Sequence, residues 1–184
     1  MLHVMCCRRK PSTYPADVPA LDASGVARSL SIEEKAVTMP SDMREFNRSV
    51  VADFRANGGE LSDGMLKGSR VVLLTTVGAR GGAEHTTPLA FFADGPDRIV
   101  LWASNMAAPK HPDWYANLAA NPSVTVEVPG ADGIDRYQAT ASIASGDERA
   151  RLLTALAEFN EKMAAHQTMT EREIPLVVVE RAAQ

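Results

Sequence analysis

Residues 69–92 read SRVVLLTTVGARGGAEHTTPLAFF, and this stretch predicts two strands joined by a glycine-rich loop. Residues 71–77 are apolar and β-branched, which is typical of a strand buried on both faces. The glycines within residues 78–82 end that strand, because glycine adopts backbone angles that are closed to other residues. The chain is extended again over residues 84–92, where Pro88 indicates a bulge or an edge strand since it has no N–H to donate. An ordinary hairpin is the simplest interpretation, and a loop that holds a phosphate is the alternative.

The composition predicts one folded domain and argues against a general nucleic-acid-binding protein. The chain has 184 residues, of which 45% are hydrophobic, and this is enough to bury a core. Its formal net charge is −4, whereas nucleic-acid-binding proteins usually carry an excess of lysine and arginine.

The cysteines and the lengths of the apolar runs indicate the cellular compartment of the protein. Cys6 and Cys7 are adjacent, so they predict neither a disulfide with each other nor a zinc site. No apolar run approaches the ~20 residues of a membrane helix. Residues 2–7 are too short for the apolar part of a secretory signal, and they precede the basic residues 8–10, which is the wrong order for one. We therefore expect a cytoplasmic protein, with peripheral membrane contact left open.

The chain divides into two regions. Residues 1–38 contain prolines and small polar residues without a sustained period, which predicts a disordered tail. The alternative is that translation begins at Met39. Residues 39–184 form the predicted folded domain. Its first helix is expected after Ser41 or Asp42, with Glu45 at a capping-box spacing, and its apolar face indicates a packing role.

The rest of the domain predicts further strands and two more helices. Pro112 suits the first position of a short helix, and Ser145 with Glu148 forms a capping box before a long one. The apolar face of the long helix comprises Leu152, Leu153, Leu156, Phe159 and Met163. Four more strands are expected over residues 98–104, 124–128, 136–142 and 174–180. Short turns between strands favour antiparallel pairing, so the fold class is α+β, mainly antiparallel β, of about six strands with flanking helices. A small barrel or half-barrel is expected, and an open antiparallel sandwich is the alternative.

A binding cleft is a more plausible source of function than a nucleophile. The four histidines have no metal-ligand spacing, no nucleophile motif occurs, and the glycine loop fits neither a P-loop nor a dinucleotide fingerprint. Arg80 in the glycine loop, together with bared backbone N–H groups, is suited to an anion, although a solvated loop charge is the plain alternative. The other candidate residues of the cleft are Lys110 and His111, which precede the Pro112 helix, and Trp102, Trp114 and Tyr115 as aromatic walls.

Six sequence blocks carry a resemblance to a known family. They are MREFNRSVVADFRANGG at 43–59, LLTTVGARGG at 73–82, TTPLAFF at 86–92, WASN at 102–105, HPDWYANLAANP at 111–122 and TEREIPLVVVE at 170–180. In these blocks, and in their order and spacing, the chain resembles the deazaflavin-dependent nitroreductase family of actinobacteria. The resemblance covers residues from Met39 to Glu180.

The resemblance implies an FMN-binding-like split β-barrel that binds coenzyme F-420, an 8-hydroxy-5-deazaflavin. In such proteins the reduced deazaflavin passes a hydride to a small, fairly apolar acceptor such as a quinone, an enone or a nitro compound. The positions that match the family's cofactor contacts are Arg80, Gly81, His85, Thr86, Thr87, Pro88, Leu89, Trp102, Ala103, Ser104, Asn105, Trp114 and Asn117. Of these positions, those in the glycine loop and on the following strand would hold the phosphate and acidic tail, and Ser104 would lie near the ring.

The sequence departs from the family pattern in both parts of the implied site. Ala79, His85 and Asn105 stand where basic residues are common in the family, which should weaken the hold on a polyanionic tail. The positions that match the family's acceptor pocket are Ala90, Asn160, Met163 and His166, where the best-known nitroreductases have tyrosines. Ser104 and His166 are the candidate catalytic residues, and a surface histidine is the plain alternative for His166.

The sequence therefore predicts an F-420-dependent reductase, without a metal. An FMN- or FAD-binding reductase on the same barrel is one alternative. A non-catalytic carrier of the deazaflavin or of a lipid-like ligand is another, and a purely structural dimer module is the last. A homodimer is compatible with each of them.

Overall fold

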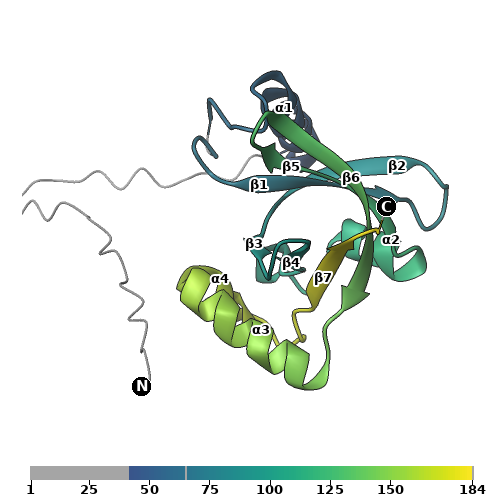
Figure 1. Cartoon of the computed structure of the whole chain (residues 1–184). Coiled ribbons are helices and arrows are strands. Elements are labelled where there is room, and N and C mark those ends of the chain that lie inside the picture. Colours follow the sequence, from purple (N-terminus) through teal and green to yellow (C-terminus); the bar gives the residue numbers. More distant parts are fainter. Residues whose placement is uncertain (1–41, 65, 184) are drawn as a thin grey trace, which may run out of the picture. The chain divides into compact units, whose positions relative to one another are not determined.

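The structure is a computed structural model that describes residues 42–64 and 66–183 (Figure 1). The predicted tail at residues 1–38 and the two alternatives for the start of translation lie outside the described residues. The helices are α1 (Met43–Ala56), α2 (Asp113–Ala120), α3 (Gly146–Phe159) and α4 (Glu161–Ala165), with 3-10 turns η1 (Asn105–Ala107) and η2 (His166–Met169). The strands are β1 (Val71–Val77), β2 (Glu84–Ala90), β3 (Phe92–Ala93), β4 (Arg98–Trp102), β5 (Ser123–Gly130), β6 (Gly133–Ile143) and β7 (Leu176–Arg181).

The strands form one curled antiparallel sheet in the order β2-β1-β5-β6-β7-β4-β3. Figure 1 shows β6 running the length of the sheet, with α1 near one of its ends and α3 near the other. The single curled sheet confirms the predicted half-barrel of the split-barrel type and excludes the open sandwich.

The predicted hairpin is present, but its second strand divides. β1 and β2 pair from Val77 opposite Glu84 to Val71 opposite Ala90. Beyond the buried Phe91, β3 pairs with β4 instead, so residues 84–93 serve both ends of the sheet and the strand count is seven, not six. β2 is an edge strand, which explains why Pro88 is tolerated within it.

Of the three predicted helix starts, the first agrees with the structure and the other two differ from it. Asp42 caps α1 as expected, accepting from the N–H of Arg44 at 2.8 Å and of Glu45 at 3.1 Å. Pro112 stands at the N-cap of α2, one residue before the predicted position. The Ser145 side chain makes no capping bond, so the capping box before α3 is wrong; Glu148 instead accepts a bond from Arg98 at 2.6 Å.

The long third helix ends earlier than predicted. Asn160 leaves the helical conformation and caps a separate short helix, accepting from the N–H of Met163 at 3.1 Å. Met163 therefore lies on α4, although it still packs against the cluster beneath α3, as the predicted apolar face required.

The buried residues form three clusters, and β1 joins two of them. Val72 and Leu74 point into the barrel interior, whereas Val71 and Leu73 pack against α1. Because successive side chains of a strand point to opposite faces, this alternation fixes α1 on the outer face of the sheet. The third cluster lies between α3 and the β4–β7 pair and includes Trp102 and Leu152.

Phe54 is the main anchor of α1, because its side chain is fully buried against β1. We expect Phe54→Ala to lower the free energy of unfolding by about 3–5 kcal/mol, the usual cost of emptying a buried aromatic site. Met43→Ala, at a position 45% exposed on the same helix, should change it by less than about 0.5 kcal/mol. Urea unfolding of both variants checks this, and equal effects would contradict the packing of α1.

Candidate functional site

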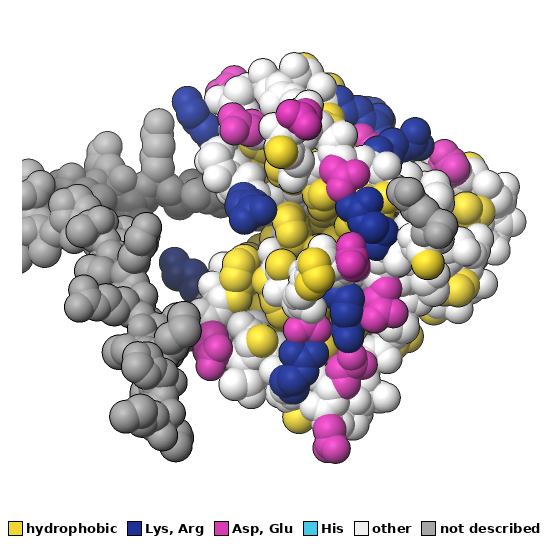
Figure 2. All heavy atoms as spheres, in the orientation of Figure 1, with side chains coloured by type: hydrophobic (Ala, Val, Ile, Leu, Met, Phe, Trp, Pro, Cys, Tyr) yellow, Lys and Arg dark blue, Asp and Glu magenta, His cyan; other side chains and the backbone are white. Residues whose placement is uncertain are grey.

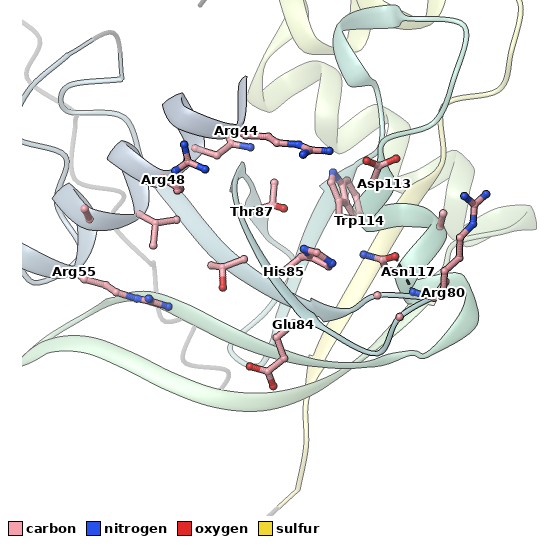
Figure 3. Close-up of a pocket in the computed structure, with 18 residues that line it drawn as sticks. Arg44, Arg48, Arg55, Arg80, Glu84, His85, Thr87, Asp113, Trp114 and Asn117 are labelled. Carbon is pink, nitrogen blue, oxygen red and sulfur yellow. Dashed lines mark hydrogen bonds between the residues drawn. The ribbon is translucent and has the colours of Figure 1, made fainter. Parts of the chain in front are cut away.

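A cavity of about 1080 Å³ lies between α1, the glycine loop, β2 and the start of α2 (Figure 3). Its volume is at the upper end of the range for small-molecule sites. Figure 3 shows α1 side chains on one side of it and the α2 and loop side chains on the other. The cavity is therefore built by segments that are far apart in the sequence.

The lining of the cavity is basic, although the chain as a whole is acidic. Arg44, Arg48, Arg55 and Arg80 line it, against two carboxylates, Glu84 and Asp113. The whole chain carries a formal net charge of −4. The arginines of the lining thus outnumber its carboxylates, and this small positive excess favours an anionic ligand.

One of the four arginines is committed to the structure. Arg55 binds Glu127 through two bonds, Nη2 to Oε1 at 2.5 Å and Nε to Oε2 at 2.9 Å. Glu127 is 5% exposed on β5, so this pair ties the end of α1 to the sheet. The hydrogen-bonded Glu127 carboxylate raises the pKa of Arg55, while burial opposes the shift. Arg55 therefore adds little net charge to the cavity.

The glycine loop uses most of its backbone N–H groups internally. Gly78 donates to the Ala83 carbonyl at 2.7 Å, and Gly82 donates to the Gly78 carbonyl at 2.9 Å. Ala79 donates to Oδ1 of Asn117 at 3.1 Å. These three groups are not bared to an anion, contrary to expectation, so the exposed Arg80 side chain carries the loop's positive charge.

Polar contacts and close packing join the segments that line the cavity to the strands beside them. Asn117 also donates to Thr76 Oγ1 at 3.1 Å, which links α2 to β1. The hydroxyls of Thr75 and Thr86 lie 2.8 Å apart across the hairpin. A Cβ at Gly78 would lie 3.1 Å from Nε2 of His85, so this glycine lets the imidazole pack against the loop.

Seven of the predicted cofactor residues meet at this cavity and six do not. Those that line it are Arg80, Gly81, His85, Thr86, Thr87, Trp114 and Asn117. The lining does not include Pro88, Leu89, Trp102, Ala103, Ser104 and Asn105. Leu89 packs on the barrel interior, and residues 102–105 end β4 and enter η1.

The aromatic residues expected to wall the cleft lie in different places. Trp114 is 6% exposed and lines the cavity, with its body in the barrel interior. Trp102 belongs to the cluster beneath α3, where its ring lies 6.5 Å from that of Phe159. Tyr115 packs on His111 at 4.8 Å, and Lys110 is exposed. The three aromatic rings therefore do not wall one ligand in the described part of the chain.

The predicted acceptor residues lie outside the cavity lining. Ala90 is exposed at the end of β2, Asn160 caps α4, and Met163 packs beneath α3. His166 begins η2 and is half-buried, and its Nδ1 is buried without a hydrogen-bond partner among the described residues. Three of the four positions thus gather around α4 and η2.

Sequence reasoning missed the α1 arginines, because it assigned α1 to packing. Arg44, Arg48 and Arg55 recur at i, i+4 and i+11, a spacing that places them on one helix face. That spacing was the available signal. The apolar face at Phe46, Val50 and Phe54 lies beside it and packs on the sheet.

The chain after β4 turns through a strained segment that Arg172 holds. Asn105, Met106 and Ala107 have φ values of 49°, 53° and 59°, a left-handed conformation that costs free energy without glycine. Arg172 donates to the carbonyls of Ala103 at 3.2 Å, Ser104, and Ala108 at 2.8 Å. One guanidinium thus satisfies the carbonyls on both sides of the turn.

The comparisons with known proteins identify the family. Residues 45–181 match the family model described as "F420H(2)-dependent quinone reductase". A Mycobacterium tuberculosis protein named F420H(2)-dependent quinone reductase is 33% identical over 133 residues, which are 71% of this chain and 86% of that protein. The chain belongs to the F420H(2)-dependent quinone reductase family.

Two solved structures agree with this assignment. One, described as an F420-H2 dependent reductase (FDR-A), is 35% identical with a TM-score of 0.52, over 61% of this chain and 95% of that chain. Another, described as a domain-swapped dimer, is 30% identical with a TM-score of 0.54, over 77% of this chain and 100% of that chain.

Family membership confirms the resemblance, the enzyme class and the cofactor. The protein is an F-420-dependent reductase, and FMN or FAD is secondary as a cofactor. The cavity fits such a cofactor by its chemistry, because guanidinium groups bind phosphate and carboxylate well. None of the helices in the described ranges is long and apolar enough to cross a membrane.

The Arg172 contacts predict a stabilising role. We expect Arg172→Met to lower the free energy of unfolding by about 2–4 kcal/mol, because it removes charge-assisted bonds to three carbonyls around the turn. Arg136→Met, at an exposed position on β6, is the control. Thermal and urea unfolding measure both, and a loss below about 0.5 kcal/mol in the first variant would show that the turn holds without the arginine.

Proposed function

We propose that this protein transfers a hydride from reduced F-420, held in the α1–α2 cavity, to a small apolar acceptor, with a quinone as the first candidate. The observation that carries the proposal is the basic cavity on an acidic chain, formed in part by the residues that match the family's cofactor positions. Family membership supports the quinone as acceptor.

The residues of the cavity have distinct roles in this proposal. Arg80 holds an anionic group at the loop, and Thr86, Thr87 and His85 line the β2 side. Trp114 gives an apolar surface beside them that excludes water. Bound reduced F-420 supplies the hydride, and the protein supplies placement, a dry cleft and control of charge.

The acceptor end is a proposal of its own. A quinone that receives a hydride also takes up one proton to become a hydroquinone. Ser104 and His166 stay the predicted residues near the acceptor, with Ala90, Asn160 and Met163 as its pocket. Support comes from the gathering of Asn160, Met163 and His166 around α4 and η2, although these residues lie outside the cavity lining.

A homodimer and a peripheral membrane contact also stay predictions. Figure 2 shows hydrophobic side chains gathered in the middle of one face, between charged residues. The large apolar side chains that are exposed in the described part are Met43, Met106, Ile143, Phe159 and Met169. Such exposure is compatible with either contact.

A fluorescence titration with oxidised F-420, and with FMN and FAD beside it, tests the proposal. We expect saturable binding of F-420 in preference to both flavins, and consumption of reduced F-420 when a soluble quinone is added. Arg80→Ala should weaken F-420 binding and make it less sensitive to salt, because a cation near the anion is lost. Preferential binding of FMN would contradict the proposal that the cavity holds F-420. Binding of F-420 without any consumption of the reduced form would favour a non-catalytic carrier.

A further inference from the structure

Two arginines of α1, Arg44 and Arg48, line the cavity, and neither side chain forms a hydrogen bond or ion pair with another residue in the described ranges. Arg44 and Arg48 lie one helical turn apart, on the same stripe as Val51 and Arg55. Figure 3 shows both on the α1 side of the cavity, with Arg80 across from them beyond Asn117. A ligand that spans the cavity therefore meets cations at both of its ends.

Five arginines in the described part of the chain bind carboxylates, and Arg44 and Arg48 are not among them. The five are Arg55, Arg98, Arg149, Arg151 and Arg181. Among the ion pairs within residues 42–64 and 66–183, none includes Arg44 or Arg48. Their charges are available to a ligand.

Their place on the helix is unfavourable for the free protein. The N-terminal end of a helix carries a partial positive charge, so a cation in the first turn, here Arg44, destabilises it. Two arginines at i and i+4 also repel each other. Asp42 relieves part of this, and the N–H groups of Glu45 and Arg44 lower the pKa of its carboxyl. An anionic ligand beside both guanidinium groups would relieve the rest.

The loop alone offers little positive charge for a polyanion. Arg80 stands next to Ala79, and the N–H groups of Gly78, Ala79 and Gly82 are engaged within the protein. The positive potential at the α1 side must then come from Arg44 and Arg48, because Arg55 is neutralised by Glu127.

We propose that Arg44 and Arg48 form a second anion subsite that binds the carboxylates of the acidic tail of F-420, while Arg80 faces the phosphate. This inference rests on the proposed function. Both α1 arginines are exposed at the rim of the cavity, where an extended tail that continues into solvent would pass. The subsite selects cofactor forms by their tail and leaves the ring contacts to other residues.

The test is a binding titration of three deazaflavins against the full chain. They are complete F-420, the phosphate-bearing form without its glutamates, and the deazaflavin nucleoside without phosphate or tail. For Arg44→Gln/Arg48→Gln we expect about tenfold weaker binding of complete F-420, since two partly exposed ion pairs contribute about two- to fivefold each. The affinity for the other two forms should not change. The salt dependence of complete F-420 binding should also become shallower.

Matched variants separate charge from folding. Arg44→Lys/Arg48→Lys should restore most of the affinity, and Arg136→Gln, which removes a charge from an exposed site on β6, should leave it unchanged. Equal losses for complete F-420 and for the form without glutamates would place the phosphate, not the tail, at α1 and overturn the inference. Unchanged binding of complete F-420 would also overturn it. Absence of F-420 binding by the unmodified protein would instead refute the proposed function itself.

Discussion

The double burial of β1 is the constraint on which the rest of the structure depends. Its odd and even positions serve two different clusters, so Val72 and Leu74 build the barrel interior while Val71 and Leu73 receive α1. The same strand hydrogen-bonds to β2 and β5, and its end opens into the glycine loop. Because α1, β2 and the loop all line the cavity, the packing and pairing of β1 set the positions of these three segments.

The charge of the cavity follows from how polar groups are satisfied elsewhere. Glu127 is buried on β5 and would be costly without a partner, so Arg55 is held there. The loop amides are bonded within the protein, partly by Asn117 from α2. What is left to attract an anion is a small set of guanidinium groups, two on α1 and one on the loop. The free positive charge of the cavity is thus carried by a few long, exposed side chains.

Features of the fold that depend on neighbouring residues could be predicted from the sequence. Features that depend on contacts between distant segments could not. The hairpin at residues 71–90, the Asp42 cap and the edge position of Pro88 depend on neighbouring residues, and each is present. The division at Phe91 depends on a change of pairing partner, which no local pattern records. Glu148 has a capping spacing but binds Arg98, fifty residues away in sequence. The α1 arginines have a readable period, yet only the docking of α1 decides that they face a cavity. Trp102 and Trp114 were both expected to wall the cleft, but they pack in different clusters, which the sequence does not record.

The central claim is that the cofactor lies in the cavity between α1 and α2. A crystal structure of the complete chain with oxidised F-420 tests it most directly. The account predicts electron density for the acidic part of the cofactor in this cavity, with its oxygens within hydrogen-bonding distance, ~3 Å, of the arginine side chains at the rim. Density for the whole cofactor at the α3–α4 side, against Trp102 and Phe159, with the α1 cavity filled by solvent, would contradict it.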